Sequence, residues 1–372
     1  MKAPGNILIS PLEWGLGHAG RMIPLARRLQ EMNNRIFIAA GEEHTALFRK
    51  ETEGMEYISF AGFRPVYSQY LPQYLMLFLQ LPLLLFHTIR DHVRLKRIIR
   101  EHDIGIVISD NRFGLWNRSV RTVYITHQPR IPFPPYLRFL EPAGVILHRM
   151  IIKKYDLCFI PDLPGEENLT GRLSHGVKLP ANVRYTGILS RFTDAPTHDN
   201  QSYDPLTHLM PRGTPHNTII LSGPEPQRGL LKQKLISTAG AGGPLTVILE
   251  GKPSENREPE KAGSFIFCPH LTASGMGRLL RTSGSVICRP GYTTIMELVS
   301  LRCSALLIPT PGQTEQEYLA GYLSSKGWFM AVSQKAVSGN LPRWPNRAIW
   351  SGELAEISRT LLGDALGELL KD

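Results

Sequence analysis

Short apolar runs alternate with segments of helical spacing along the first half of the chain. Four runs are short, continuous and closed by polar residues, which is typical of buried parallel strands: 6–10, 105–110, 122–128 and 155–162. A segment with helical spacing starts at Arg21 and carries Pro24 in its first turn, where proline is tolerated. Strands that alternate with helices predict a parallel α/β sheet.

The alternation restarts in the second half, after a polar stretch that contains several prolines. Further strands are expected at 218–223, 245–251, 264–270, 284–291 and 303–311. The chain is therefore expected to form two Rossmann-like parallel-sheet domains that face each other across a cleft. The expected bounds are 1–190 for the first domain, 191–216 for the connection, 217–350 for the second domain and 351–372 for a C-terminal amphipathic helix.

A glycine-rich loop follows the first predicted strand. Gly15, Gly17 and Gly20 match G-x-G-x-x-G, the dinucleotide fingerprint, and an acidic residue, Glu42 or Glu43, follows at about the expected spacing of ~20 residues. Residues 11–14 separate the strand from Gly15, whereas a dinucleotide fold needs a tight turn there. The alternative is a different ligand that approaches the glycine backbone at a helix N-terminus.

Three side chains near strand ends are candidates for proton transfer. His18 lies inside the glycine-rich loop, and a histidine titrates near neutrality, so it can accept a proton from a hydroxyl. Asp110, at the end of a predicted strand, could orient that imidazole, and His127 follows the next strand. The alternatives are a structural histidine that caps the loop and an aspartate that caps the following turn.

The most informative stretch of the second half runs from 285 to 327. Gly291 opens a helix directly after a predicted strand, and its amides and helix dipole would attract a phosphate. Glu297, one turn further on, could accept hydrogen bonds from ribose hydroxyls, although Thr294 and Glu297 also form a capping-box pattern. After the next strand, three polar side chains could bind sugar hydroxyls or simply cap a helix: Gln313, Glu315 and Gln316.

The net charge of +10 favours anionic partners such as phosphates, nucleotides, acidic membrane surfaces or nucleic acid. Nucleic acid is the weakest of these, because the basic residues have no interleaved aromatic platform and no recognition motif is present. The four cysteines form no C-x-x-C pair and are expected to be reduced core residues of a cytosolic protein: Cys158, Cys268, Cys288 and Cys303.

The most membrane-like segment runs from Tyr70 to His102. Prolines and glutamines interrupt it, so no run approaches the ~18–20 apolar residues of a spanning helix. Apolar turns followed by a basic helix that ends near Arg100 could lie on an anionic bilayer; the alternative is a buried helix with a solvated basic end. With no signal peptide expected, the predicted location is the cytoplasm, peripheral to the inner face of the cell membrane.

Several motifs resemble, in the same order, those of the MurG-like (family 28) glycosyltransferases, typified by a bacterial N-acetylglucosaminyltransferase of peptidoglycan synthesis. The matching motifs are GLGHAGR at 15–21, THQ at 126–128, GILSR at 187–191, CRPG at 288–291, T-x-x-E at 294–297 and Q-x-Y at 316–318. Less characterised relatives with GLGHAxR fit the first motif still better. The resemblance spans nearly the whole chain and implies the GT-B fold, with a nucleotide-sugar held mainly by the second domain.

The resemblance also implies a role for each matching residue. Arg191 and the helix start at Gly291 would contact the donor diphosphate, Glu297 the ribose, and Gln316, beside Gln313 and Glu315, the donor sugar. The remaining donor-side residues would be Ser222, Gly223, His270, Leu271, Arg289, Thr293 and Thr294. His18 and His127 would face the acceptor. Pro224 and Pro226 stand where the family has a glycine-serine loop, and this departure points away from peptidoglycan synthesis.

The expected reaction is inverting transfer of a sugar from a nucleotide diphosphate sugar, with UDP implied by the resemblance, to a hydroxyl of a lipid or glycan acceptor of the cell envelope. His18 is the expected base, oriented by Asp110, with His127 as the second choice. Arg191, backbone amides and a helix dipole would stabilise the leaving charge, so no metal and no cofactor is expected. A nucleotide-sugar 2-epimerase of the same fold and a non-catalytic nucleotide-sugar-binding protein remain as alternatives.

Overall fold

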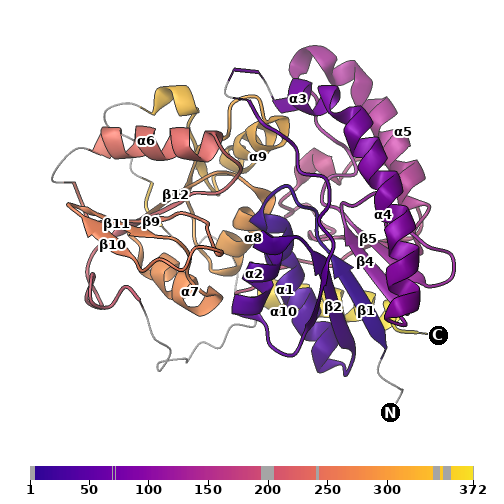
Figure 1. Cartoon of the computed structure of the whole chain (residues 1–372). Helices are drawn as coiled ribbons and strands as arrows, with labels where there is room; N and C mark the ends of the chain where they lie inside the picture. The colour runs from indigo at the N-terminus through magenta and orange to yellow at the C-terminus, as the bar shows by residue number, and fades with distance from the viewer. Residues whose placement is uncertain are drawn as a thin grey trace. The chain divides into compact units, whose positions relative to one another are not determined.

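The chain forms two compact units in the computed structural model, shown in Figure 1. The structure describes residues 5–68, 70–71, 73–193, 205–239, 243–337, 344–346 and 353–371. Unit 1 comprises Met1–Val66, Tyr74–Leu189 and Gly352–Asp372, and unit 2 comprises Tyr67–Gln73 and Ser190–Ser351. Much of the connection expected at 191–216, namely 194–204, lies outside the described residues.

Unit 1 is built on a seven-stranded parallel sheet in the order β3-β2-β1-β4-β5-β6-β7. The strands are β1 (Asn6–Ser10), β2 (Arg35–Ala40), β3 (Glu56–Ser59), β4 (Ile106–Asp110), β5 (Arg121–Ile125), β6 (Leu157–Ile160) and β7 (Val183–Tyr185). The strand order reverses between β1 and β4, whose register pairs Ile7 with Ile106. Ligands of parallel α/β sheets bind beyond the carboxyl ends of the strands at such a switch point.

Helices cover both faces of this sheet, because its strands are apolar on both sides. Alternation along β1 places Ile7 and Ile9 in a core with α1, α2 and α10, and Leu8 in a core with α4. The helices are α1 (Leu16–Glu31), α2 (Glu42–Glu51), α3 (Gln73–Leu79), α4 (Leu81–Glu101), α5 (Glu141–Ile152) and α10 (Leu354–Leu369), with short 3-10 helices η1 (Pro135–Leu140) and η2 (Gly171–Leu173). The first residue of α3, Gln73, is assigned to unit 2.

Helix α1 begins earlier than the pattern predicted. Its first residue is Leu16, so His18 lies in the first turn and Pro24 lies inside the helix rather than in the first turn. A proline there removes the amide that would bond to the carbonyl of Gly20. The apolar face of α1, which includes Met22, is fully buried against the sheet. This tertiary packing stabilises the helix despite the missing hydrogen bond.

The C-terminal helix α10 belongs to unit 1, and its apolar face packs in the same core as α1. Arg184 of β7 donates to both carboxylate oxygens of Glu368, at 2.7 and 2.8 Å. Gly187 has a φ of +70°, and a Cβ there would lie only 2.5 Å from the Cα of Ser358. The Ser358 hydroxyl in turn accepts a hydrogen bond from the amide of Ile188 at 3.0 Å. Position 187 therefore requires a glycine, because its backbone packs directly against α10.

Unit 2 contains a second seven-stranded sheet, in the order β10-β11-β9-β8-β12-β13-β14, parallel except for β10. Its strands are β8 (Asn217–Ile220), β9 (Thr246–Leu249), β10 (Glu260–Ala262), β11 (Phe265–Cys268), β12 (Ser285–Cys288), β13 (Leu306–Leu307) and β14 (Met330–Ala331). Its helices are α6 (Gln227–Ala239), α7 (Ala273–Thr282), α8 (Tyr292–Ser300), α9 (Thr314–Ser325) and the 3-10 turn η3 (Gln334–Ala336). The switch point of this sheet lies between β8 and β12.

Two expectations about the chain as a whole can be compared with the structure. Within the described ranges, no helix is both long and apolar enough to cross a bilayer. The four cysteines are buried and unpaired, as expected of core residues. No group of three or more histidine, cysteine, aspartate or glutamate side chains in the described part of the chain is arranged to hold a metal ion.

Candidate active site

The switch point of unit 1 brings together the three residues predicted for proton transfer. Asp110 is the last residue of β4 and is fully buried. His18 lies in the first turn of α1, directly after β1, with 20% of its side chain exposed. His127 lies two residues beyond the end of β5 and is buried. The strands are neighbours and parallel, so their carboxyl ends meet at one edge of the sheet.

Two basic side chains contact the Asp110 carboxylate. His18 Nδ1 lies 2.9 Å from Asp110 Oδ2, and Arg21 Nε donates to the same oxygen at 2.9 Å. Arg21 Nη2 donates to the second oxygen, Oδ1. Burial alone would raise the pKa of Asp110, but the charge of Arg21 and the contact with His18 outweigh burial and lower this pKa to about 2. Asp110 is therefore ionised at neutral pH.

Arg21 holds this group together, and the sequence analysis gave it no role. It is almost completely buried and lies one turn after His18 on the same face of α1. Its Nη1 lies 3.0 Å from Nδ1 of His127. A guanidinium can only donate, so Nδ1 of His127 accepts this bond. The i, i+3 spacing of His18 and Arg21 was visible in the sequence, but the helix was expected to start only at Arg21.

His18 Nδ1 has two competing neighbours. The Asp110 carboxylate accepts and Arg21 Nη2 donates, and each lies 2.9 Å from this nitrogen. The nitrogen carries either a proton or a lone pair, so only one of the two contacts is a hydrogen bond at a time. The other ring nitrogen, Nε2, makes no hydrogen bond to any residue in the described ranges.

The loop between β1 and α1 is anchored by a second residue that the sequence analysis did not single out. Glu13 is buried, and its carboxylate accepts from the amide of Gly41 at 2.6 Å and from Arg64 Nη2 at 2.8 Å. His44 lies 3.6 Å away, and burial lowers its pKa. The loop is thus a wide, anchored turn and not the tight turn of a dinucleotide fold, which argues against the NAD interpretation.

In unit 2, the predicted donor-side residues follow β8 and β12. Ser222 and Gly223 lie two and three residues beyond the end of β8, and Gly223 has a φ of +93°. Gly291 is the N-cap residue of α8, and Thr293 and Thr294 lie in the first turn of this helix. The amides of the first turn and the positive end of the helix dipole therefore lie at the switch point, in an arrangement that favours an anion.

Arg289, one residue beyond β12, adds a buried positive charge to this region. It is 1% exposed and donates to the carbonyls of Ile308 at 3.0 Å and Gln227 at 3.1 Å. Burial lowers the pKa of Arg289 to about 10, so the side chain stays charged at neutral pH. Its partners in the described part of the chain are carbonyl groups, which do not neutralise this charge.

Arg191 and Glu297 form a buried ion pair in unit 2. Arg191 Nε donates to Glu297 Oε1 at 2.8 Å, and each side chain is less than one-tenth exposed. Burial raises the pKa of Glu297, and the adjacent Arg191 partly offsets this rise. Two residues predicted to contact different parts of the donor are therefore in direct contact in this structure.

The other predicted donor-side residues lie in the loops of unit 2. Gln313 is the N-cap residue of α9, and Glu315 is in its first turn. Gln316 is buried, and its side-chain oxygen accepts from the amide of Thr310 at 2.8 Å, which fixes the loop before α9. His270 and the buried Leu271 precede α7. The structure thus places all donor-side residues in unit 2 and all acceptor-side residues in unit 1.

Comparison with known proteins finds a sequence match for part of the second unit. Residues 272–343 match the Glycosyltransferase family 28 C-terminal domain. A curated relative from Desulforudis audaxviator, a UDP-N-acetylglucosamine--N-acetylmuramyl-(pentapeptide) pyrophosphoryl-undecaprenol N-acetylglucosamine transferase, is 28% identical over 123 residues. The aligned part covers 32% of this chain and 32% of the relative, so the match spans about a third of the length of each.

Solved structures match over nearly the whole chain. The glycosyltransferase SnogD from Streptomyces nogalater has a TM-score of 0.54 at 15% identity, covering 98% of this chain and 95% of its own. The calicheamicin glycosyltransferase CalG4 has a TM-score of 0.56 at 14% identity, covering 98% and 94%. The spinosyn rhamnosyltransferase SpnG, in complex with thymidine diphosphate, has a TM-score of 0.55 at 14% identity, covering 99% and 92%.

Two parallel α/β units with this likeness define the GT-B fold, as the sequence predicted. The fold, together with the match over residues 272–343, supports a glycosyltransferase. The chain is thus similar to the family 28 glycosyltransferases of the GT-B fold.

Proposed function

We propose that this protein transfers a sugar, with inversion, from a nucleotide diphosphate sugar to a hydroxyl of its acceptor. The observation that carries the proposal is the partly exposed His18 in contact with the buried, ionised Asp110 at the switch point of unit 1. An imidazole paired in this way can act as a general base. We propose UDP as the nucleotide, because the curated relative is named for a UDP-sugar.

In the productive tautomer, Nδ1 of His18 donates to Asp110 and Nε2 carries the lone pair. Nε2 takes the proton of the acceptor hydroxyl as its oxygen attacks the anomeric carbon from the face opposite the diphosphate. The bond from that carbon to the diphosphate oxygen breaks, and Asp110 stabilises the imidazolium. His127 is a poorer candidate, because while its Nδ1 accepts from Arg21 its neutral ring carries the proton on Nε2.

The leaving nucleoside diphosphate carries negative charge, which unit 2 is suited to stabilise. The amides and dipole of α8 start at Gly291, and Arg289 adds a cation whose charge no carboxylate offsets in the described part of the chain. The Arg191–Glu297 pair adds a second cation and a carboxylate that can accept from ribose hydroxyls. We therefore propose a reaction that needs neither a metal nor another cofactor.

The surface of α3 and α4 supports a lipid or lipid-linked glycan as the acceptor, in synthesis of cell-envelope glycoconjugates. Large apolar side chains are exposed along these helices: Phe78, Leu79, Leu81, Leu83, Leu85, Phe86, Ile89 and Val93. The second half of α4 is basic, from Arg90 to Arg100. Contiguous exposed apolar side chains next to cations favour contact with an anionic bilayer.

The proposal is tested by turnover with a panel of nucleotide diphosphate sugars and a lipid extract as the source of acceptor. His18→Gln should lower turnover by roughly 10²- to 10⁴-fold, the usual contribution of a general base. His175→Gln is a matched control, since His175 is also 20% exposed and faces a buried carboxylate, Asp162, at 3.4 Å. We expect this variant to retain turnover close to that of the wild type.

Each other outcome of this assay contradicts a stated part of the proposal. Equal losses in His18→Gln and His175→Gln would show that His18 is not the base. A sugar isomer formed without acceptor would indicate a nucleotide-sugar 2-epimerase. Nucleotide binding with no turnover across the panel would indicate a non-catalytic nucleotide-sugar-binding protein.

A further inference from the structure

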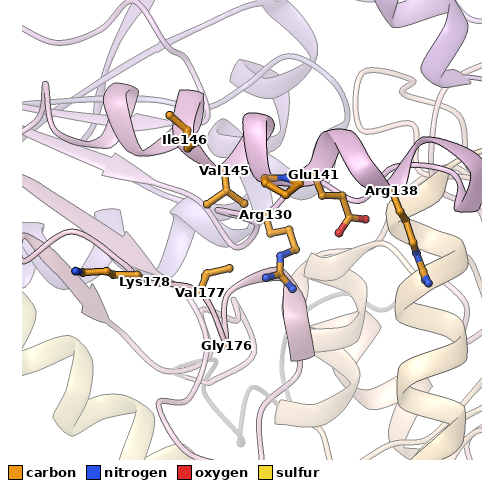
Figure 2. Close-up of a pocket in the computed structure, with 9 residues that line it drawn as sticks. Arg130, Arg138, Glu141, Val145, Ile146, Gly176, Val177 and Lys178 are labelled. Carbon is orange, nitrogen blue, oxygen red and sulfur yellow. The ribbon is translucent and has the colours of Figure 1, made fainter.

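A hollow lies on the surface of unit 1 between α5 and the segment that follows η2, shown in Figure 2. Its volume is about 470 Å³, which is within the usual range for small-ligand sites. Three cations line it, Arg130, Arg138 and Lys178, together with the apolar side chains of Val145, Ile146 and Val177; Figure 2 shows Val145 and Val177 between Lys178 and Arg130. None of these residues belongs to the proton-transfer group described above.

The positive charge of this hollow is not neutralised. Glu141 is its one acidic lining residue, and that carboxylate already accepts from Arg172 Nη1 at 2.8 Å and from the amide of Phe133 at 3.2 Å. The three cations form no ion pair with any carboxylate in the described ranges. In Figure 2 the Glu141 carboxylate appears between the guanidinium groups of Arg130 and Arg138. The hollow is therefore electrostatically suited to an anion.

Exposed apolar side chains lie on η1 and α5, two elements that also contribute lining residues to the hollow. Phe139 of η1 is 74% exposed, and Leu147 and Met150 of α5 are 58% and 55% exposed. Leu147 and Met150 are three residues apart on α5, so they share one face of this helix. A cationic hollow beside exposed apolar side chains is complementary to a phospholipid, whose phosphate is anionic and whose chains are apolar.

We propose that this hollow is a specific headgroup site for an anionic membrane phospholipid. Arg130, Arg138 and Lys178 supply the positive charge that attracts the phosphate, and the exposed apolar side chains of η1 and α5 enter the boundary between headgroups and acyl chains. The proposal rests on the membrane contact proposed for α4 and adds a distinct site to it. Arg130 follows His127 by three residues, so their Cα atoms are at most ~11 Å apart. Lipid binding here would hold the catalytic edge of unit 1 close to the bilayer, where a lipid acceptor is located.

The test measures co-sedimentation of the full chain with phosphatidylcholine vesicles that contain or lack phosphatidylglycerol. The triple variant Arg130→Gln, Arg138→Gln and Lys178→Gln should bind the anionic vesicles at least tenfold more weakly, given about fivefold per cation near an anionic surface. A control with the same charge change replaces three exposed cations elsewhere in unit 1: Arg28→Gln, Arg35→Gln and Lys50→Gln. This control should lose less than about threefold. If the triple variant does not fold, the double variant Arg138→Gln and Lys178→Gln alters only exposed side chains.

The outcomes separate this proposal from the one on which it rests. Equal losses in the two triple variants would mean general attraction by charge and would overturn the headgroup site while leaving the membrane contact of α4 in place. No binding of the wild type to anionic vesicles would overturn both. Thermal stabilisation of the wild type by glycerol phosphate, lost in the triple variant and accompanied by no vesicle binding, would identify a site for a soluble anion and overturn the lipid assignment. Nucleotide-induced stabilisation serves as the readout of intact unit 2 throughout.

Discussion

At the scale of single residues, the central feature is a carboxylate that orients two basic side chains. Asp110 is fully buried, yet its pKa is about 2, because Arg21 and His18 stabilise its charge more than burial opposes it. A base of this kind depends on the position and tautomer of the imidazole, and both are set by residues that do not touch the substrate. In the proposed reaction, Asp110 and Arg21 are therefore positioning residues and His18 is the catalytic residue.

The pKa of Asp110 predicts how stability depends on pH. It lies below the ordinary value of 3.8, so the stabilisation is fully present above about pH 4 and is lost as pH falls through about 2. A shift of this size corresponds to about 2 kcal/mol. Asp110→Asn should lower the free energy of unfolding by about this amount or more at pH 7, and the difference should narrow below pH 4. Denaturant unfolding at several pH values measures it.

The matched control for this experiment is Asp364→Asn, which alters an exposed aspartate of α10. It should change the free energy of unfolding by less than ~0.5 kcal/mol at every pH. A stability difference for Asp110→Asn that stays constant down to about pH 2 would show that the buried carboxylate is not stabilised by charge.

Arg21→Lys tests the positioning role. Lysine keeps the charge but presents one compact ammonium and cannot make the separate contacts that Arg21 makes to Asp110 and His127. We expect kcat to fall by roughly 10- to 100-fold, with little change in KM for the donor, because the donor residues lie in unit 2. Arg27→Lys, on the same helix, is the control and should leave kcat unchanged. A raised donor KM with an unchanged kcat would instead indicate a role in binding.

Sequence reasoning found the three titratable residues of this site but missed two others: Arg21, which contacts them, and Glu13, which anchors the loop before α1. His18, Asp110 and His127 could be predicted because each follows an apolar run, and strand ends converge in a parallel sheet. Arg21 was missed because the expected helix started at Arg21 itself, which hid its spacing from His18. Glu13 was missed because its partners, Gly41 and Arg64, are distant in sequence.

At the scale of helices and strands, the sequence predicted the buried central elements best. The strands with continuous apolar runs appear where the pattern placed them, whereas β3, β7, β10 and β14 are short and lie toward the sheet edges, where hydrophobic periodicity is weak. Helix α10 was expected as an amphipathic helix, but the surface that it covers could not be predicted. That surface is formed by unit 1, more than 150 residues earlier along the chain.

Gly187→Ala tests how tightly α10 is fixed to unit 1. The new Cβ would lie 2.5 Å from the Cα of Ser358, and φ at this position is +70°. We expect a loss of roughly 2–4 kcal/mol in the free energy of unfolding, from steric overlap and backbone strain. Gly363→Ala, in α10, is the control: an added Cβ there meets open space, and the change should stabilise by up to ~1 kcal/mol. A Gly187→Ala protein as stable as the wild type would show that α10 packs loosely.

At the scale of the whole molecule, the proposed membrane contact would combine the net charge of +10 with the exposed apolar side chains of α3 and α4. The charge would draw the protein to an anionic surface over a distance set by salt, and the apolar side chains would provide the short-range contact. A phosphate-rich donor and a membrane-bound acceptor would both benefit from this charge. The net charge is compatible with both a phosphate-rich donor and a membrane-bound acceptor. Substitutions are therefore needed to separate its effect on donor binding from its effect on membrane binding.

Phe86→Ser with Ile89→Ser should weaken binding to anionic vesicles by about tenfold or more, because both side chains are more than 60% exposed on α4. The control pair, Met32→Ser with Ile357→Ser, removes two apolar side chains that are 41% and 46% exposed on other elements of unit 1. Vesicle flotation is the measurement. Similar binding by the two double variants would contradict contact through α4.

The most direct test of the account is thermal stabilisation of the purified protein by UDP, GDP, dTDP, CMP, NAD and NADP. A ligand that binds the folded chain raises the unfolding temperature by an amount that grows with the logarithm of its concentration relative to its Kd. The account predicts that one nucleoside diphosphate, with UDP expected, stabilises the protein, and that Arg289→Gln abolishes the shift while His18→Gln leaves it unchanged. Stabilisation by NAD or NADP alone would contradict it and would mean that Gly15, Gly17 and Gly20 form a dinucleotide site after all.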